Sequence, residues 1–132
     1  MKKLLALVCM TVLTVFAAQA KENKFEDINH SDLKKAIAEG KVTLIDVNGS
    51  DSYKAGHIPG AIDFQSQKAD LAKVLPKEKD ALIVAYCGNE HCGAYAKGAQ
   101  AAAELGYTNV KHYSAGIAGW KEKKETVEQA KN

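Results

Sequence analysis

The chain has 132 residues and carries 18 lysines against 16 acidic residues, a formal net charge of +2. This length suffices for one domain but not for two, and the near balance of charge gives no reason to expect nucleic acid or an anionic membrane surface as a partner. Every basic side chain apart from histidine is a lysine, since the sequence contains no arginine. No rigid guanidinium fork is therefore available to bind an oxyanion.

The first twenty residues, MKKLLALVCMTVLTVFAAQA, differ in character from the rest. Two lysines precede an apolar run over 4–17, and Ala18-Gln19-Ala20 follows as a small-x-small cleavage site. This order is typical of a bacterial-type secretory signal peptide. An uncleaved membrane anchor is the alternative, but the apolar run is short for a span. We therefore expect 1–20 to be a cleaved signal peptide and 21–132 to form one periplasmic or secreted domain, with no membrane contact after cleavage.

Cleavage would change both the charge and the cysteine count. It would remove Lys2 and Lys3, so that 18 lysines become 16 against 16 acidic residues and the formal charge becomes zero. It would also remove Cys9, which leaves Cys87 and Cys92 in an oxidising compartment where a disulfide can form. Such a bridge closes a very small loop and stabilises little, so a redox or protective role suits it better than a structural one.

Apolar runs and helical patterns alternate along the chain. Strands are predicted over 24–28, 42–47, 61–64, 81–86 and 109–113. Helices are predicted over 31–39, 67–75, 94–105 and 117–131, with Ser31 as the N-cap of the first. The polar segment 48–60, with its glycines and proline, is predicted to be a loop. This alternation indicates an α/β fold, an open and mainly parallel sheet with helices on both faces.

In such folds the functional crevice lies at the carboxyl ends of the strands, and the segment AYCGNEHCGA (85–94) begins at such an end. Its glycines let backbone N–H groups point into one hollow, and the following helix adds positive charge, which favours a thiolate. Four interpretations remain open. Cys87 accepts sulfane sulfur, or it forms a redox couple with Cys92, or both cysteines bind a metal with His91, or Cys87 is an inert packed residue. The metal interpretation is weak because its one plausible fourth ligand, His112, ends a different strand.

Two longer stretches carry a resemblance. LIDVNGSDSYKAGHIPGAIDF (44–64) resembles the upstream motif D-V-R-x-x-x-E-Y-x-x-G-H-I-P-G-A of the rhodanese family. IVAYCGNEHCGAYAKGAQAAAELGYTNVKHYSAGIAGW (83–120) resembles the active-site strand, loop, helix and closing segment of that family. The resemblance implies a rhodanese-like domain with a five-stranded sheet. It also implies that Cys87 is the catalytic nucleophile, which takes sulfur from a donor such as thiosulfate and passes it to cyanide or a thiol. The loop amides would bind the anionic persulfide; that loop comprises Gly88, Asn89, Glu90, His91, Cys92 and Gly93.

The sequence departs from the family pattern where the family often has cations. Cys92 stands where many members have a loop arginine, and Asn48 replaces the arginine that follows Asp-Val. The loop thus resembles a C-x-x-x-x-C variant, in which Cys92 would resolve the Cys87 persulfide or form a disulfide with Cys87. Glu90 adds a negative charge to the loop, which disfavours a dianion such as thiosulfate. An organic persulfide or polysulfide is then the alternative donor.

Other residues near the crevice are interpreted as structural support. We expect His57 to be a turn residue bonded to the backbone, and Asp46 to hold a loop by accepting backbone N–H groups. Trp120 is expected to fill the core beneath the last helix.

The sequence thus predicts a sulfurtransferase that needs no metal and no organic cofactor. Its partners would be a small-molecule sulfur donor and a thiol or cyanide acceptor, with a protein sulfur acceptor or a thiol reductant as further partners. The alternative function is a non-catalytic rhodanese module that senses redox state or binds a partner through Cys87 and Cys92.

Overall fold

The computed structural model describes residues 25–131. Its centre is a five-stranded sheet with the order β1-β5-β4-β2-β3, and every neighbouring pair is parallel. The strands are β1 (Glu26–Asp27), β2 (Thr43–Asp46), β3 (Ile62–Asp63), β4 (Ile83–Tyr86) and β5 (Val110–His112). The two most buried strands, β2 and β4, come from the continuous apolar runs of the sequence, as expected for a sheet that is covered on both faces.

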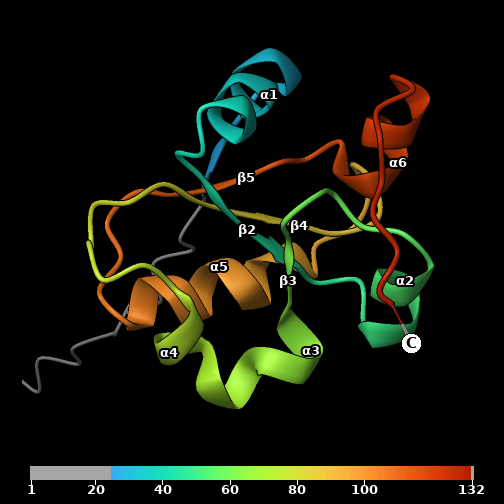
Figure 1. Ribbon diagram of the computed structural model, residues 1–132. Coiled ribbons are helices and arrows are strands. Elements are labelled where there is room, and N and C mark those ends of the chain that lie inside the picture. Colours follow the sequence, from blue (N-terminus) through green and yellow to red (C-terminus); the bar gives the residue numbers. More distant parts are fainter. Residues whose placement is uncertain (1–24, 132) are drawn as a thin grey trace, which may run out of the picture.

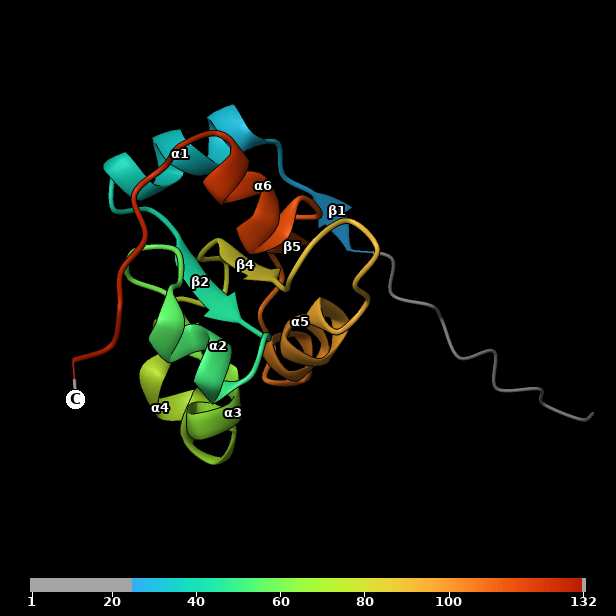
Figure 2. The ribbon, with the colours of Figure 1, turned by 90° about the vertical axis from the view of Figure 1, so that its right-hand side faces the viewer.

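Helices cover both faces of the sheet (Figures 1 and 2). They are α1 (His30–Ala38), α2 (Ser50–Ala55), α3 (Phe64–Gln67), α4 (Leu71–Val74), α5 (Tyr95–Glu104) and α6 (Gly116–Glu122), with a 3-10 turn, η1 (Lys68–Asp70), between α3 and α4. Figure 1 shows α1 and α6 on one face, and α3, α4 and α5 on the other. The predicted α/β class with helices on both faces is confirmed.

Alternation along the strands divides the core in two. On β4, Val84 and Tyr86 pack under α1 and α6, whereas Ile83 and Ala85 pack under α4 and α5. Trp120 is buried in the first cluster, and its Nε1 donates to the backbone oxygen of Thr126 at 2.8 Å. Both faces of β4 are therefore covered by packed side chains. This packing fixes the end of the strand and with it the position of Cys87, the next residue.

Among the predicted elements, three errors have a physical cause in the structure. The N-cap of α1 is Asn29 rather than Ser31, because the Asn29 side chain accepts the N–H of Asp32 at 2.9 Å. The segment 48–60 contains the short helix α2, which buries none of its side chains and so has no apolar stripe to reveal it. The final helix ends at Glu122 and does not reach 131.

The helix α6 ends at Glu122 for a physical reason. Residues 121–131 are rich in lysine and glutamate and offer few apolar side chains to bury. Backbone groups of Glu128 instead exchange two hydrogen bonds of 2.9 Å with His57. The tail thus pairs with the GHIPG segment.

In residues 25–131, no helix is long and apolar enough to cross a membrane, and the predicted signal peptide lies outside the described residues.

Candidate active site at the Cys87–Cys92 loop

Cys87 follows β4 at the carboxyl edge of the sheet and is only 3% exposed. Its backbone is fixed by the start of α6. The N–H of Ile117 donates to the oxygen of Cys87 at 3.0 Å, and the N–H of Ala118 donates to the oxygen of Gly88 at 2.9 Å. The first turn of a helix has no internal partners for its N–H groups, so these bonds satisfy donors of α6 while they hold the loop.

Gly116 allows this close approach. Its φ is +62°, and a Cβ built on it would lie 2.5 Å from the oxygen of Cys87 and 2.8 Å from the carbonyl carbon of Gly88. No side chain fits between these backbones without moving one of them. Gly116 in the closing segment is therefore needed for the position of Cys87.

A disulfide joins Cys87 to Cys92, with the two Cα atoms 6.3 Å apart. Asn89 shapes the turn between them, because its side-chain oxygen accepts the N–H of His91 at 2.9 Å and its backbone oxygen accepts the N–H of Cys92 at 3.1 Å. In the oxidised loop these two amides therefore face Asn89. The sulfur of Cys87 lies 3.2 Å from the backbone oxygen of Cys92, an acceptor within reach of the Cys87 thiol after reduction.

The rim of the loop is negatively charged and open to solvent. Glu90 and His91 are 74% and 85% exposed and lie 3.5 Å apart. Neither side chain reaches Cys87 in the oxidised loop. Together with Asn89 they line a hollow of about 330 Å³ against α6. No group of three His, Cys, Asp or Glu side chains among residues 25–131 is placed to hold a metal ion.

Asp46 ends β2 directly beside Tyr86 and is 1% exposed. It accepts the hydroxyl of Tyr86 at 2.7 Å and the N–H of Asn48 at 2.8 Å. The same hydroxyl accepts the N–H of Ile58 at 3.0 Å. Burial raises the pKa of Asp46, and these donors only partly offset it. The pKa of Tyr86 is also raised, first by burial and then by the neighbouring Asp46 carboxylate. This network ties β2, β4 and the GHIPG segment together beneath the loop.

His57 is buried at the other end of this network. Its Nδ1 donates to the backbone oxygen of Tyr53 at 2.8 Å, and its ring stacks on that of Tyr53 with 3.7 Å between centroids. Its Nε2 lies 3.5 Å from the Glu128 carboxylate. These contacts connect α2, the GHIPG segment and the tail, and they place His57 in a structural setting.

The side-chain amide of Asn48 lies in this region, and no role for it was predicted from the sequence. Its Nδ2 is buried and has no hydrogen-bond partner of good geometry among the described residues, although hydrogen bonding from the Asn48 side chain helps to lower the pKa of Asp46. Its Oδ1 lies 3.6 Å from the point where Gly88 would carry a Cβ. A buried donor without a well-placed partner is costly. The position of Asn48 directly after Asp46-Val47 is the sequence signal that could have identified it.

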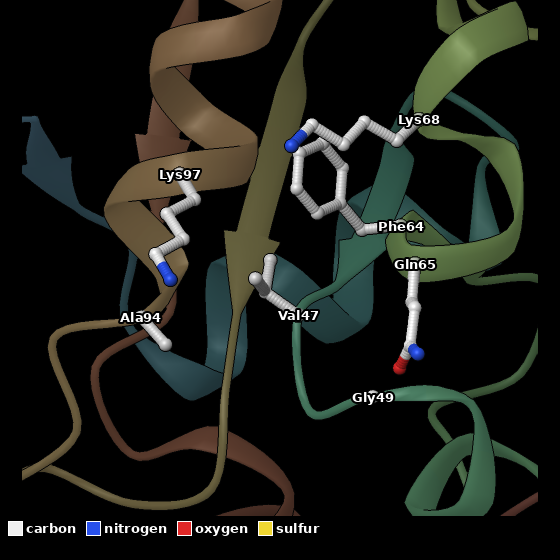
Figure 3. Close-up of a pocket in the computed structure, with 7 residues that line it drawn as sticks. All are labelled: Val47, Gly49, Phe64, Gln65, Lys68, Ala94 and Lys97. Carbon is white, nitrogen blue, oxygen red and sulfur yellow. The ribbon is translucent and has the colours of Figure 1, made fainter.

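A second hollow, of about 230 Å³, lies on the α3/α5 side of the loop (Figure 3). Its lining residues come from the exit of β2, from α3 with η1, and from the start of α5; they are Val47, Gly49, Phe64, Gln65, Lys68, Ala94 and Lys97. Sequence reasoning missed this site. The two lysines lie on different helical segments, 29 positions apart in the numbering of the chain, so no local motif joins them.

Comparisons with known proteins agree with this geometry. A family model described as a rhodanese-like domain matches residues 29–123. The HTH-type transcriptional regulator Rv0324 of Mycobacterium tuberculosis is 33% identical over 110 residues, which cover 83% of this chain and 47% of the regulator. The chain thus spans about half the length of that relative.

Two further relatives match more of their own length. Human thiosulfate:glutathione sulfurtransferase is 29% identical over 105 residues, which cover 70% of this chain and 90% of the human protein. The crystal structure of a rhodanese-related protein from Thermoplasma volcanium is 25% identical with a TM-score of 0.60, and the match covers 80% of this chain and 100% of that one.

Proposed function

Because this chain belongs to the rhodanese-like domain family, we propose that it is a sulfurtransferase in which Cys87 carries sulfane sulfur as a persulfide. The observation that carries the proposal is the position of Cys87. It lies at the carboxyl end of the central strand β4, its backbone is held by the first turn of α6, and it is bonded to a second cysteine. The disulfide supports the proposal because it brings a second sulfur atom of the same loop to Cys87.

The reaction would proceed by two displacements at sulfur. In the reduced protein, the Cys87 thiolate attacks the outer sulfur of a donor such as thiosulfate, a persulfide or a polysulfide. The sulfur–sulfur bond of the donor breaks, and the rest of the donor leaves with the electron pair. A thiol or cyanide acceptor then attacks the outer sulfur of the persulfide, and Cys87 departs again as a thiolate. No net oxidation occurs, so neither a metal nor an organic cofactor is needed.

Cys92 would offer a second way to discharge the persulfide. Its thiolate attacks Cys87 Sγ, the outer sulfur leaves and takes up a proton as hydrosulfide, and the Cys87–Cys92 disulfide of the structure forms. A thiol reductant, either a small molecule or a protein, then supplies two electrons to reopen the loop. The proximity of the two cysteines supports this resolving role.

The similarity to human thiosulfate:glutathione sulfurtransferase supports a thiol as the acceptor. The predicted signal peptide and the Cys87–Cys92 disulfide support a location in the periplasm or outside the cell. Cell fractionation, with sequencing of the N-terminus of the mature protein, tests that location. Recovery of the full-length chain with the cytoplasmic fraction would contradict it.

A second candidate function is a redox-sensing or partner-binding module without sulfur transfer. The disulfide favours it, as does the similarity to a transcriptional regulator of which this chain spans about half. In that case the reduced and oxidised loops would differ in their affinity for a partner, and Cys87 would accept no sulfur.

Intact mass measurement separates the two candidates. The reduced protein is incubated with thiosulfate, with polysulfide or with an organic persulfide, and its mass is compared with that of Cys87→Ser and Cys92→Ser. We expect Cys92→Ser to gain one sulfur that cyanide removes, the wild type to gain it only until Cys92 displaces it, and Cys87→Ser to gain none. Cys92→Ser is the matched control because it also abolishes the disulfide. Absence of sulfur gain with every donor would refute the transferase and favour the module.

The same variants test the resolving role. After loading, the wild type should release hydrosulfide and lose two free thiols without an added acceptor, whereas Cys92→Ser should keep its persulfide. Equal release of hydrosulfide from both proteins would eliminate Cys92 as the resolving residue.

A further inference from the structure

The hollow between α3 and α5 borders the two segments that flank the Cys87–Cys92 loop, the exit of β2 and the start of α5. Val47 lines it and directly follows β2, where its N–H donates to the oxygen of Tyr86 at 2.9 Å. Ala94, another lining residue, is only two positions beyond Cys92. The hollow therefore begins where the loop re-enters α5.

Cys87 belongs to the same side of the sheet. Ile83 and Ala85 of β4 face the α4/α5 half of the core, together with Ile45 of β2. Side chains alternate along a strand, and the ladder between β2 and β4 continues beyond Asp46 through the Val47–Tyr86 bond. Cys87 directly follows β4 and has the same parity as Ile83 and Ala85. The alternation, carried one residue beyond the strand, directs Cys87 toward the half of the core that borders the hollow.

The hollow combines an apolar floor with two positive charges. Figure 3 shows Lys97 of α5 and Lys68 of η1 on opposite sides, with Val47 and Phe64 between them. Neither lysine forms an ion pair with another described residue. Gln65 completes the rim. Its Oε1 accepts the N–H of Ser50 at 2.9 Å, which leaves its amide N–H₂ as a further donor.

We propose that this hollow, lined by Lys68, Lys97, Val47 and Phe64, is the subsite that anchors an organic anion attached to the transferable sulfur. The chemistry it fits is an apolar group that carries a carboxylate or a sulfonate. The lysines neutralise the anionic oxygens and Phe64 packs against the carbon groups. The subsite supplies beside the loop the cationic charge that a loop without arginine lacks. This inference rests on the proposed sulfurtransferase function and names the class of its donor.

An organic thiosulfonate illustrates the step. The Cys87 thiolate attacks the outer sulfur, the bond between that sulfur and the sulfonyl sulfur breaks, and the sulfinate leaves with the electron pair. Cys87 is left as a persulfide. With a carboxylated persulfide as donor, the same attack releases the parent thiolate. In both cases the leaving group is the organic anion that the lysines hold. Inorganic thiosulfate has no apolar part to contact Phe64, and the exposed Glu90 carboxylate repels its second charge.

Binding is tested without transfer chemistry. Benzenesulfonate, benzoate and inorganic sulfate are titrated into reduced Cys87→Ser, and backbone amide NMR shifts are followed. Both aromatic anions should shift the amides of Val47, Gly49 and Ala94, whereas sulfate at the same concentration should not. A carboxylate or a sulfonate source is then distinguished by which aromatic anion binds more tightly.

Removing either positive charge should weaken binding about two- to five-fold, the range of a solvent-exposed charge interaction. The variants are Lys68→Gln and Lys97→Gln, each in the Cys87→Ser background. Lys77→Gln is the matched control, since Lys77 is an exposed lysine outside the hollow. Unchanged binding in both variants, or shifts confined to other residues, would overturn the subsite.

The kinetics of sulfur transfer to Cys87 provide the second test of the subsite. In the otherwise wild-type reduced protein, benzenethiosulfonate should be used with a higher kcat/KM than methanethiosulfonate or thiosulfate, and Lys97→Gln should raise its KM more than it lowers kcat. If Cys87 gains sulfur equally well from all three donors, and the lysine variants behave like wild type, the subsite is wrong and the transferase stands. If no donor loads Cys87, the transferase is wrong, and with it the donor assignment, whatever binds in the hollow.

Discussion

Replacing Gly116 by alanine tests whether the start of α6 positions the reactive loop. Two costs follow from the structure. An L-residue at φ +62° costs about 1–2 kcal/mol, and a Cβ only 2.5 Å from the oxygen of Cys87 must displace backbone, an overpacking cost of about 1–3 kcal/mol. We expect Gly116→Ala to lower the free energy of unfolding by about 2–5 kcal/mol. Because the displaced atoms belong to Cys87 and Gly88, sulfur loading should slow as much as about 100-fold.

Gly40 provides a matched control for the backbone cost. Its φ is +65°, and a Cβ there would have no heavy atom within 4 Å. Gly40→Ala should therefore lose only about 1–2 kcal/mol and keep its loading rate. Urea unfolding can be followed by the fluorescence of Trp120, the one tryptophan of the chain, which is 4% exposed in the fold. If the two variants unfold within about 0.5 kcal/mol of each other, the steric argument for Gly116 is refuted.

Two further predictions concern buried polar groups. Tyr86→Phe removes a hydroxyl that donates to Asp46 and accepts from Ile58 N–H, so both partners lose a bond in the core and urea unfolding should show a loss of about 2–5 kcal/mol; a loss below about 0.5 kcal/mol would show that the network is dispensable. Burial lowers the pKa of His112 from its ordinary 6.5, and Asp27 only partly counters this. The unfolded chain then takes up the proton first, so stability falls as pH drops from about 6.5 through the lowered folded pKa, and His112→Gln should flatten that part of the stability–pH curve; an unchanged curve would contradict the assignment.

The α/β architecture could be predicted because a strand that is buried on both faces of a sheet appears in the sequence as a continuous apolar run. The runs that became β2 and β4 are continuous and apolar, and the alanine-rich segment predicted as 94–105 became α5 over Tyr95–Glu104. These features required no tertiary information. The order of the strands did not follow from the same patterns, since every connection is a crossover and local periodicity does not specify which strands pair.

The features that the sequence did not reveal depend on contacts between distant segments. The helix α2 buries no side chain, and the end of α6 is decided by the pairing of Glu128 with His57, which are far apart in the chain. The position of Cys87 at a strand end was predictable from one segment. The lysines of the adjacent hollow were not, because Lys68 and Lys97 lie on separate helical segments that only the fold brings to one hollow.

The placement of charge around the loop explains how a chain without arginine could still perform anionic sulfur chemistry. A persulfide and its leaving group both carry negative charge, which needs compensation close to Cys87. In the oxidised loop, Asn89 engages the amides of His91 and Cys92, and the rim bears Glu90. The lysines of the proposed subsite lie on η1 and α5, outside the loop. Binding of an organic anion would therefore not depend on the redox state of the loop, whereas a persulfide can form only on the reduced Cys87 thiolate.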